Sequence, residues 1–274
     1  MVKTTYRVAD YIADFFHKKG VRNVYSLPGG GAMHLIDAFT KNENINHIAF
    51  FHEQGASIAA EAASRSAEND IGVCCVTTGP GATNAVTAVA GAWIESSPLV
   101  IISGQVKRAD MLGAKKLRQT GVQEVQITRV VAPITKYSKV VSSPGEVHEI
   151  LEEAYVLATN GRKGPVWIDV PLDVQGAPYI LGKNVFSKVV EDANCDLDID
   201  KIVGLLRGSQ KPLFFWGNGV KLDKATGDAA RLIETHGLPS VFSWNASDIL
   251  DYENKWNFGR PGVVAQRHAN FIVQ

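Results

Sequence analysis

The sequence IAFFHEQGASIAAEAA, residues 48–63, joins an apolar run typical of a strand to an alanine-rich helix that opens on a carboxylate, Glu53. An acidic side chain in the first turn of a helix is stabilised by the helix dipole by about 0.3–1 kcal/mol. For a lone glutamate this structural role is a sufficient explanation. A role in ligand binding requires that other parts of the chain converge on the same point.

Two glycine-rich turns provide this convergence. The segments LPGGG, residues 27–31, and TGPGATN, residues 78–84, each follow an apolar run and precede a helical pattern. In open α/β sheets ligands bind outside the carboxyl ends of the strands, and glycine there lets the backbone approach a ligand closely. Together with the strand-to-helix turn before Glu53 they make three turns at one sheet edge, which predict a cleft in which Glu53 lies between two loops and can contact a flat ring.

The hydrophobic periodicity predicts the fold class. Strands alternate with helices at short intervals, which indicates right-handed βαβ crossovers and a doubly wound, mainly parallel sheet with helices on both faces. We therefore expect an α/β domain with six strands. The helices are expected at 5–19, 33–39, 53–67, 82–95 and 144–159, and five of the six strands at 23–25, 47–50, 71–77, 99–103 and 165–170.

The same hydrophobic pattern predicts the domain organisation. Residues 1–180 are expected to form the first domain, the irregular stretch 181–198 that follows Pro171 and Pro178 a linker, and residues 199–274 a second α/β domain. A doubly wound domain has about six strands, whereas the second part shows only two, at 212–216 and 239–242, with helices at 199–206 and 225–236. We expect this second domain to be incomplete, the chain to be a piece of a longer or shortened polypeptide, and residues 199–274 to expose apolar surface.

Composition excludes several classes of protein. Lys+Arg and Asp+Glu number 28 each, so no overall charge favours nucleic acid or an anionic membrane. The N-terminus lacks the apolar core of a signal peptide, and no apolar run has the length of a membrane span, so we expect a cytoplasmic protein. Cys74 and Cys75 are neighbours in one strand and must point to opposite faces, while Cys195 is remote, so neither a disulfide framework nor a metal site is expected.

Four motifs in order resemble the pyrimidine-binding domain of the thiamine-diphosphate enzymes related to acetolactate synthase. They are YSLPGG (25–30), HEQ (52–54), TGPGATN (78–84) and ISGQ (102–105). The resemblance covers essentially the whole chain, because GRPG (259–262) and QRHANF (266–271) fit the central domain of that family. One departure is Phe51, where acetolactate synthases themselves often carry arginine.

The resemblance implies thiamine diphosphate as cofactor and Glu53 as the catalytic residue. In this family a glutamic acid hydrogen-bonds N1′ of the aminopyrimidine ring and favours the imino tautomer, whose N4′ removes the C2 proton. The glycines would line the ring slot because a Cβ there would collide with the ring. The residues implied to bind the cofactor are Pro28, Gly29, Gly30, Glu53, Gly79, Pro80 and Asn84.

The same resemblance implies further contacts. His52 could contact the substrate, and so could Gln119 and Gln123, which lie in a long polar loop, 105–126, that includes a stretch similar to the Gln-Glu segment near the family's active site. The Mg²⁺ ligands are expected outside this chain, because no Gly-Asp-Gly followed by a distant Asn occurs. No residue supports FAD.

The function implied is a carboligase or lyase acting on a 2-keto acid such as pyruvate, with this chain supplying the aminopyrimidine half of a site at the interface of a homodimer or homotetramer. A 2-keto-acid decarboxylase of the same family remains an alternative. So does a catalytically inert binding or assembly module, since the diphosphate–Mg²⁺ domain is absent and the 274-residue chain alone is expected to be inactive. A nucleotide-binding redox domain has only Gly217-Asn218-Gly219 in its favour, and the third glycine of that fingerprint is missing.

Overall fold

The computed structural model describes residues 6–66, 71–179 and 197–274. The chain divides into two compact units, Met1–Ala193 and Asn194–Gln274, and each is described by itself. Apart from its last two residues, the predicted linker at 181–198 lies outside the described residues.

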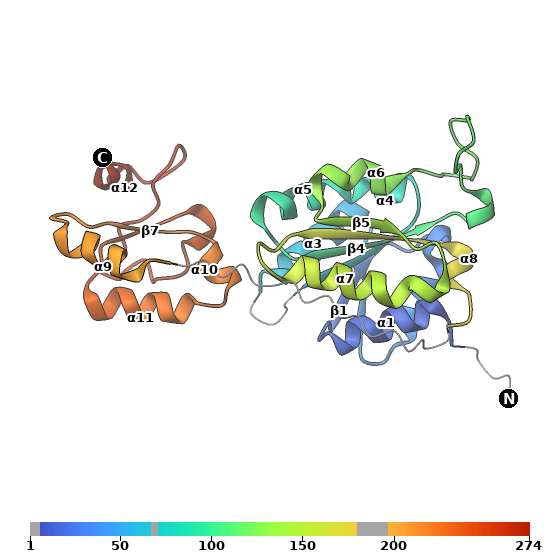
Figure 1. The fold of residues 1–274 in the computed structure, drawn as a ribbon, viewed down its shortest axis with the longest axis horizontal. Helices are drawn as coiled ribbons and strands as arrows, with labels where there is room; N and C mark the ends of the chain where they lie inside the picture. Colours follow the sequence, from blue (N-terminus) through green and yellow to red (C-terminus); the bar gives the residue numbers. More distant parts are fainter. Residues whose placement is uncertain (1–5, 67–70, 180–196) are drawn as a thin grey trace. The chain divides into compact units, whose positions relative to one another are not determined.

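The first unit contains a six-stranded sheet in which every neighbouring pair of strands is parallel (Figure 1). The strand order is β2-β1-β3-β4-β6-β5, and the predicted fold class is confirmed. One strand that the sequence pattern did not locate is β5, because it lies at the edge of the sheet and none of its residues is fully buried. The strands are β1 (Asn23–Ser26), β2 (Asn46–Ala49), β3 (Gly72–Val76), β4 (Leu99–Gln105), β5 (Tyr137–Val140) and β6 (Pro165–Pro171).

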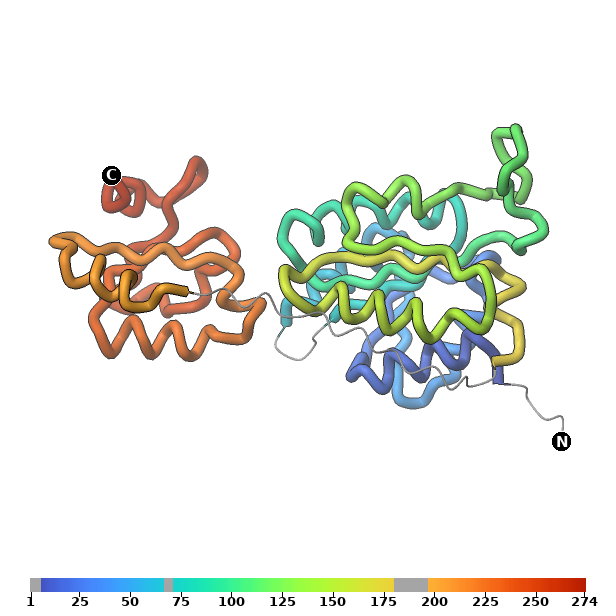
Figure 2. The backbone as a smooth tube through the Cα atoms, viewed as in Figure 1, coloured from blue at the N-terminus to red at the C-terminus, as the bar shows by residue number. Residues whose placement is uncertain are grey.

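Helices cover both faces of this sheet, as the tube in Figure 2 also shows. One hydrophobic cluster joins the sheet to α1 (Val8–Lys18), α2 (Met33–Lys41) and α7 (Val147–Thr159), and it includes Cys75. A second cluster on the other face includes Cys74, so the two cysteines point to opposite faces as predicted. Its helices are α3 (Glu53–Ser64), α5 (Val86–Glu95) and α6 (Ile127–Val131).

One predicted helix differs in the structure. The helix expected at 82–95 is divided into α4 (Pro80–Asn84) and α5, because the N–H of Ala85 bonds the carbonyl of Ala82, three residues back rather than four. A short helix, α8 (Leu172–Gln175), follows β6 directly. In the described residues, no helix is both long and apolar enough to cross a membrane.

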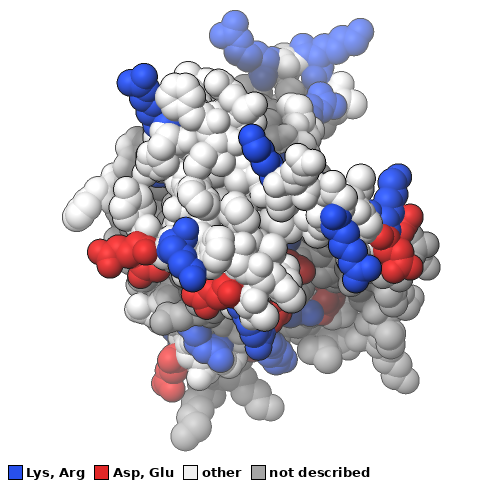
Figure 3. Space-filling view, turned by 90° about the vertical axis from the view of Figure 1, so that its left-hand side faces the viewer, with Lys and Arg blue, Asp and Glu red and all other residues white. Residues whose placement is uncertain are grey.

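The second unit is a smaller α/β arrangement in which two described strands pair in parallel. Its core is small, and α9 buries none of its residues. Large apolar side chains are exposed as expected, among them Ile202, Leu205, Phe215 and Phe271, and Figure 3 shows a broad uncharged area on one face of the molecule. The elements are α9 (Ile199–Gly208), β7 (Phe214–Trp216), α10 (Gly219–Leu222), α11 (Thr226–His236), β8 (Ser240–Phe242) and α12 (Arg267–Val273).

Candidate functional site

The strand order of the first unit contains a topological switch point between β1 and β3. The chain passes from β1 to β2 on one side and from β3 to β4 on the other, so the turns that follow β1 and β3 diverge. Ligands of open α/β sheets bind at such a point, outside the carboxyl ends of the strands. The two glycine-rich turns lie there, and α3 begins after the adjacent β2.

Glu53 is the first residue of α3 and is buried, with 7% of its surface exposed. Its Oε2 accepts a hydrogen bond of 2.9 Å from the Asn84 amide. Within the described part of the chain, Oε1 has no hydrogen-bond partner and faces Gly81, where a Cβ would lie 2.9 Å away. Oε1 is not among the fully buried polar atoms without a partner, so it reaches the surface and is open to a ligand. The helix dipole alone would not require Glu53 to be buried.

Thr77 holds the turns together beside Glu53. Its Oγ1 accepts a hydrogen bond of 3.0 Å from the backbone N–H of Gly31. A Cβ on Gly29 would lie 2.5 Å from the Thr77 Cβ, and a Cβ on Gly81 would lie 2.5 Å from its methyl carbon. The sequence analysis missed Thr77, although its place between a buried strand and a glycine-rich turn was a signal.

Two of the glycines predicted to bind the cofactor also have a packing role within the protein. A Cβ on Gly79 would lie 2.0 Å from the carbonyl oxygen of Gln123, and a Cβ on Gly29 would meet Thr77. These two glycines therefore allow segments of the protein itself to pack closely. Gly30 is exposed and has nothing within 4 Å of its Cβ position, which leaves space for a ligand there.

The other predicted site residues are exposed. Pro28 precedes Gly29, and Pro80 is the first residue of α4. His52 is the N-cap of α3, and its Nδ1 accepts a hydrogen bond of 3.1 Å from the N–H of Gln54. The side chain of His52 thus already has a local role at the helix start.

The two predicted lid glutamines differ from each other. Gln123 has a positive φ of 60°, and its backbone lies against Gly79, which brings this residue to the candidate site. The amide of Gln119 donates a hydrogen bond of 2.6 Å to the carbonyl of Gly121 within its own loop. Beside His52, the side chain of Phe51 is fully exposed.

The sequence analysis did not single out one buried acid, Asp169, which lies on the strand next to β4. Asp169 on β6 accepts hydrogen bonds of 2.5 Å from the Ser103 hydroxyl and 2.9 Å from the Gln105 amide. Burial raises the pKa of Asp169 to about 7, although the hydrogen bonds from Ser103 and Gln105 act in the opposite direction. The signal was an aspartate inside an otherwise apolar strand, VWIDV.

These features define a class of protein. A largely buried carboxyl between glycine-rich turns at a switch point, with one oxygen held by Asn84 and the other open to a ligand, is suited to hydrogen-bond a nitrogen of a flat heterocycle, as in an α/β cofactor-binding domain. Among the described residues, no group of three or more His, Cys, Asp or Glu side chains could hold a metal ion.

Comparison with known proteins identifies the family. Residues 6–129 match the model of the thiamine pyrophosphate enzyme N-terminal TPP binding domain, and residues 199–274 match that of the thiamine pyrophosphate enzyme central domain. Since the two models together span most of the chain, it belongs to the thiamine pyrophosphate enzyme family.

The similar curated proteins agree with this assignment. The chain is 32% identical over 268 residues to the acetolactate synthase isozyme 1 large subunit of Escherichia coli (strain K12), a match that covers 97% of this chain and 46% of that protein. It is 32% identical over 273 residues to the chloroplastic acetolactate synthase of Arabidopsis thaliana, covering 97% of this chain and 39% of that protein. The chain thus spans less than half the length of these relatives.

Proposed function

We propose that the chain supplies the aminopyrimidine half of the site in a thiamine-diphosphate-dependent carboligase or lyase that acts on a 2-keto acid such as pyruvate, as in acetolactate synthase. The observation that carries this proposal is the buried Glu53 carboxyl, which has one oxygen held by Asn84 and the other without a partner in the described residues. The names of the similar proteins support the substrate class.

The residues of this chain would divide the task as follows. Glu53 holds and exchanges a proton at N1′ of the pyrimidine ring, because a carboxyl can both donate and accept a hydrogen bond there. Asn84 fixes the orientation of that carboxyl through its 2.9 Å hydrogen bond. Gly30 leaves room for the ring, while Pro28, Gly29, Gly79 and Pro80 shape the turns on either side. When bound, thiamine diphosphate supplies a nucleophilic carbon for attack on the carbonyl of the keto acid.

The partners of this site follow from the same proposal. Mg²⁺ and the diphosphate would be held by residues outside the described ones, across the interface of a homodimer or homotetramer. The fully exposed Phe51 and exposed His52 beside Glu53 fit a surface that a second subunit covers. FAD has no support among the described residues, and the protein is proposed to act in the cytoplasm.

Glu53→Gln tests this proposal in a protein that carries the chain together with a diphosphate-binding domain. The amide is isosteric and can still accept from Asn84, so the melting temperature should change little. The release of CO2 from pyruvate should fall by roughly 10²-fold or more, the scale of losing a general acid–base partner.

Glu61 gives a matched control on the same helix. It is also 7% exposed, but its two oxygens accept from Ser97 and Arg65. Glu61→Gln should lower stability and leave turnover per folded molecule close to wild type. Equal turnover in Glu53→Gln and wild type would refute the assignment.

Calorimetric titration of the 274-residue chain gives a second test. We expect weak binding of thiamine diphosphate that does not depend on Mg²⁺, since the described residues hold no metal cluster. Tight Mg²⁺-dependent binding, or turnover by this chain alone, would show that the diphosphate half also lies within it.

A further inference from the structure

Gln105, the last residue of β4, is buried and has every hydrogen-bonding position of its amide occupied. Its Nε2 donates to Asp169 Oδ2 at 2.9 Å and to the carbonyl of Val125 at 3.0 Å. Its Oε1 accepts from the Thr78 hydroxyl at 3.0 Å and from the N–H of Val106 at 2.9 Å. A primary amide has two N–H groups and two acceptor lone pairs, so this side chain is saturated.

Asp169 determines the orientation of the Gln105 amide. A carboxyl oxygen of Asp169 faces the Gln105 side chain, so the amide nitrogen of Gln105 lies toward Asp169. The amide oxygen of Gln105 therefore lies toward Thr78. Asp169 is held in turn by Ser103, whose hydroxyl oxygen accepts a hydrogen bond of 2.7 Å from the Trp167 indole. These side chains are buried, so a reversed Gln105 amide would place its nitrogen against another donor, the N–H of Val106.

The partners above Gln105 belong to two separate parts of the candidate site. Thr78 begins the turn that continues to Asn84, which we call the 78–84 turn. Val125 lies near the end of residues 106–126, which we call the 106–126 segment. The carbonyl oxygen of Gln123 in this segment packs against Gly79 of the turn, where a Cβ would lie only 2.0 Å from it. Gln123 and Gly79 both have positive φ angles, 60° and 59°.

The 106–126 segment is also tied together internally. The Glu124 carboxylate accepts hydrogen bonds from the backbone N–H groups of Leu112, Thr120 and Gly121. A displacement of Val125 would therefore carry the neighbouring residues with it. Gln105 is the side chain that hydrogen-bonds both this segment and the 78–84 turn.

We propose that Gln105 is a positioning residue that couples the 106–126 segment to the 78–84 turn, so that the two parts of the site take up one geometry together. The consequence for the cofactor rests on the proposed function, because the 78–84 turn carries Asn84, the partner of Glu53. The coupling itself does not depend on that function.

Hydrogen exchange measured by mass spectrometry on the 274-residue chain tests the coupling. Gln105→Met keeps the length of the side chain and removes its amide. Exchange should rise by about tenfold or more in peptides that cover both the 78–84 turn and residues 121–126, since several buried hydrogen bonds are lost. Peptides from α1 and α7 should keep their rates. Gln126→Met, next to Val125 but outside the Gln105 network, is the matched control and should leave the 78–84 turn unchanged.

Thr78→Val is a second variant that tests the coupling if Gln105→Met does not fold. It removes only the hydroxyl that donates to Gln105 and preserves the shape of the side chain. We expect a smaller rise of about threefold in the same two regions. Faster exchange in only one region, or in neither, would overturn the coupling.

Titration with thiamine diphosphate of a protein that carries this chain together with a diphosphate-binding domain then tests the consequence for the site. Affinity should fall by about tenfold in Gln105→Met and stay near wild type in Gln126→Met. Unchanged affinity in Gln105→Met, with faster exchange in both regions, would show that the coupling does not reach the cofactor. If that wild-type protein binds no thiamine diphosphate, the proposed function fails, while the exchange result still decides the coupling.

Discussion

Replacing Asp169 by asparagine should change how the stability of the first unit depends on pH. Burial raises the pKa of Asp169 to about 7 in the folded chain, whereas its ordinary value is 3.8. Between these two values the folded state holds a proton that the unfolded state has released. Because the folded state binds more protons, its stability falls as pH rises through this window.

The magnitude follows from the difference between the two pKa values, which corresponds to about 4 kcal/mol of unfolding free energy. This contribution is fully present below pH 4 and is lost by about pH 7. The amide in the Asp169→Asn variant cannot titrate, so the wild-type free energy of unfolding minus that of the variant should fall by up to this amount between these limits.

Urea denaturation at several pH values between about 4 and 8 measures this difference. Tryptophan fluorescence is a suitable signal, because Trp167 hydrogen-bonds Ser103 in the same buried network. Asp173→Asn is the control. Although burial raises the pKa of Asp173, hydrogen bonds from the backbone and side chain of Arg108 outweigh it and lower this pKa from 3.8, so the contribution of Asp173 is lost only as pH falls below about 4. The difference between wild type and Asp173→Asn should therefore stay nearly constant between pH 4 and 8. A difference between wild type and Asp169→Asn that stays constant from pH 4 to 8 would refute the reasoning.

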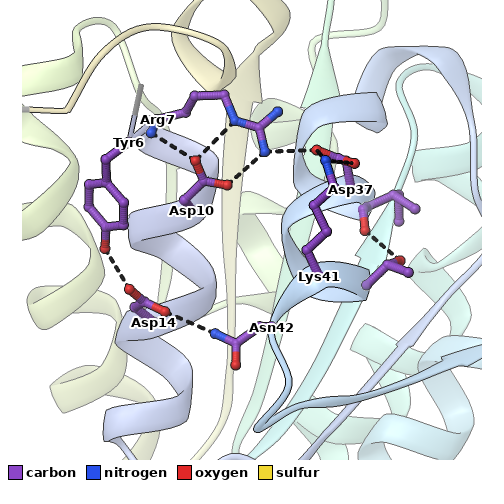
Figure 4. A network of polar contacts seen from close by, with 9 residues as sticks. Tyr6, Arg7, Asp10, Asp14, Asp37, Lys41 and Asn42 are labelled. Carbon is purple, nitrogen blue, oxygen red and sulfur yellow. Dashed lines mark hydrogen bonds and ion pairs between the residues drawn. The ribbon is translucent and has the colours of Figure 1, made fainter. Parts of the chain in front are cut away.

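Two further substitutions test packing and polar contacts. Gly79→Ala should lower the free energy of unfolding by about 2 kcal/mol or more, because φ is positive and the new Cβ would meet the Gln123 carbonyl; an unchanged melting temperature would contradict this contact. Arg7→Ala should cost about 1–2 kcal/mol, since it removes the hydrogen bonds that the Arg7 side chain donates to Asp10 from two nitrogens and to Asp37 (Figure 4). Urea denaturation should show that Arg7→Lys recovers only part of this loss, and full recovery would show that charge alone matters.

Much of the fold could be predicted from local pattern. The strand-to-helix change at Glu53 was placed correctly because the apolar run and the alanine-rich run have different periods. The strand β5 was not located, because an edge strand buries little and its short sequence YSKV has no distinctive pattern. Division of the expected helix at Ala85 depends on a single hydrogen bond, which no residue type specifies.

The candidate site was predictable only where a turn motif marked it. Glycine-rich turns and the carboxylate between them are visible in the sequence, and the structure places them at adjacent strand ends. The sequence places Thr77 before a glycine-rich turn, Gln105 at the end of ISGQ and Asp169 within an apolar strand, but it does not show their contacts. Their contacts depend on which strands are neighbours, since Gln105 and Asp169 are 64 residues apart.

By itself, the sequence determined the order of most elements, the parallel α/β class and the residue that opens α3, because these depend on local period and on short motifs. The tertiary structure decided which carboxyl on that helix is left for a ligand. Glu53 and Glu61 are equally buried, but Glu61 is satisfied by Arg65 and by Ser97, 36 residues away, whereas Glu53 has the amide of Asn84, 31 residues away, on one oxygen. Partners at such separations are brought together by the strand order β2-β1-β3-β4, and the pattern around a single helix contains no information about them.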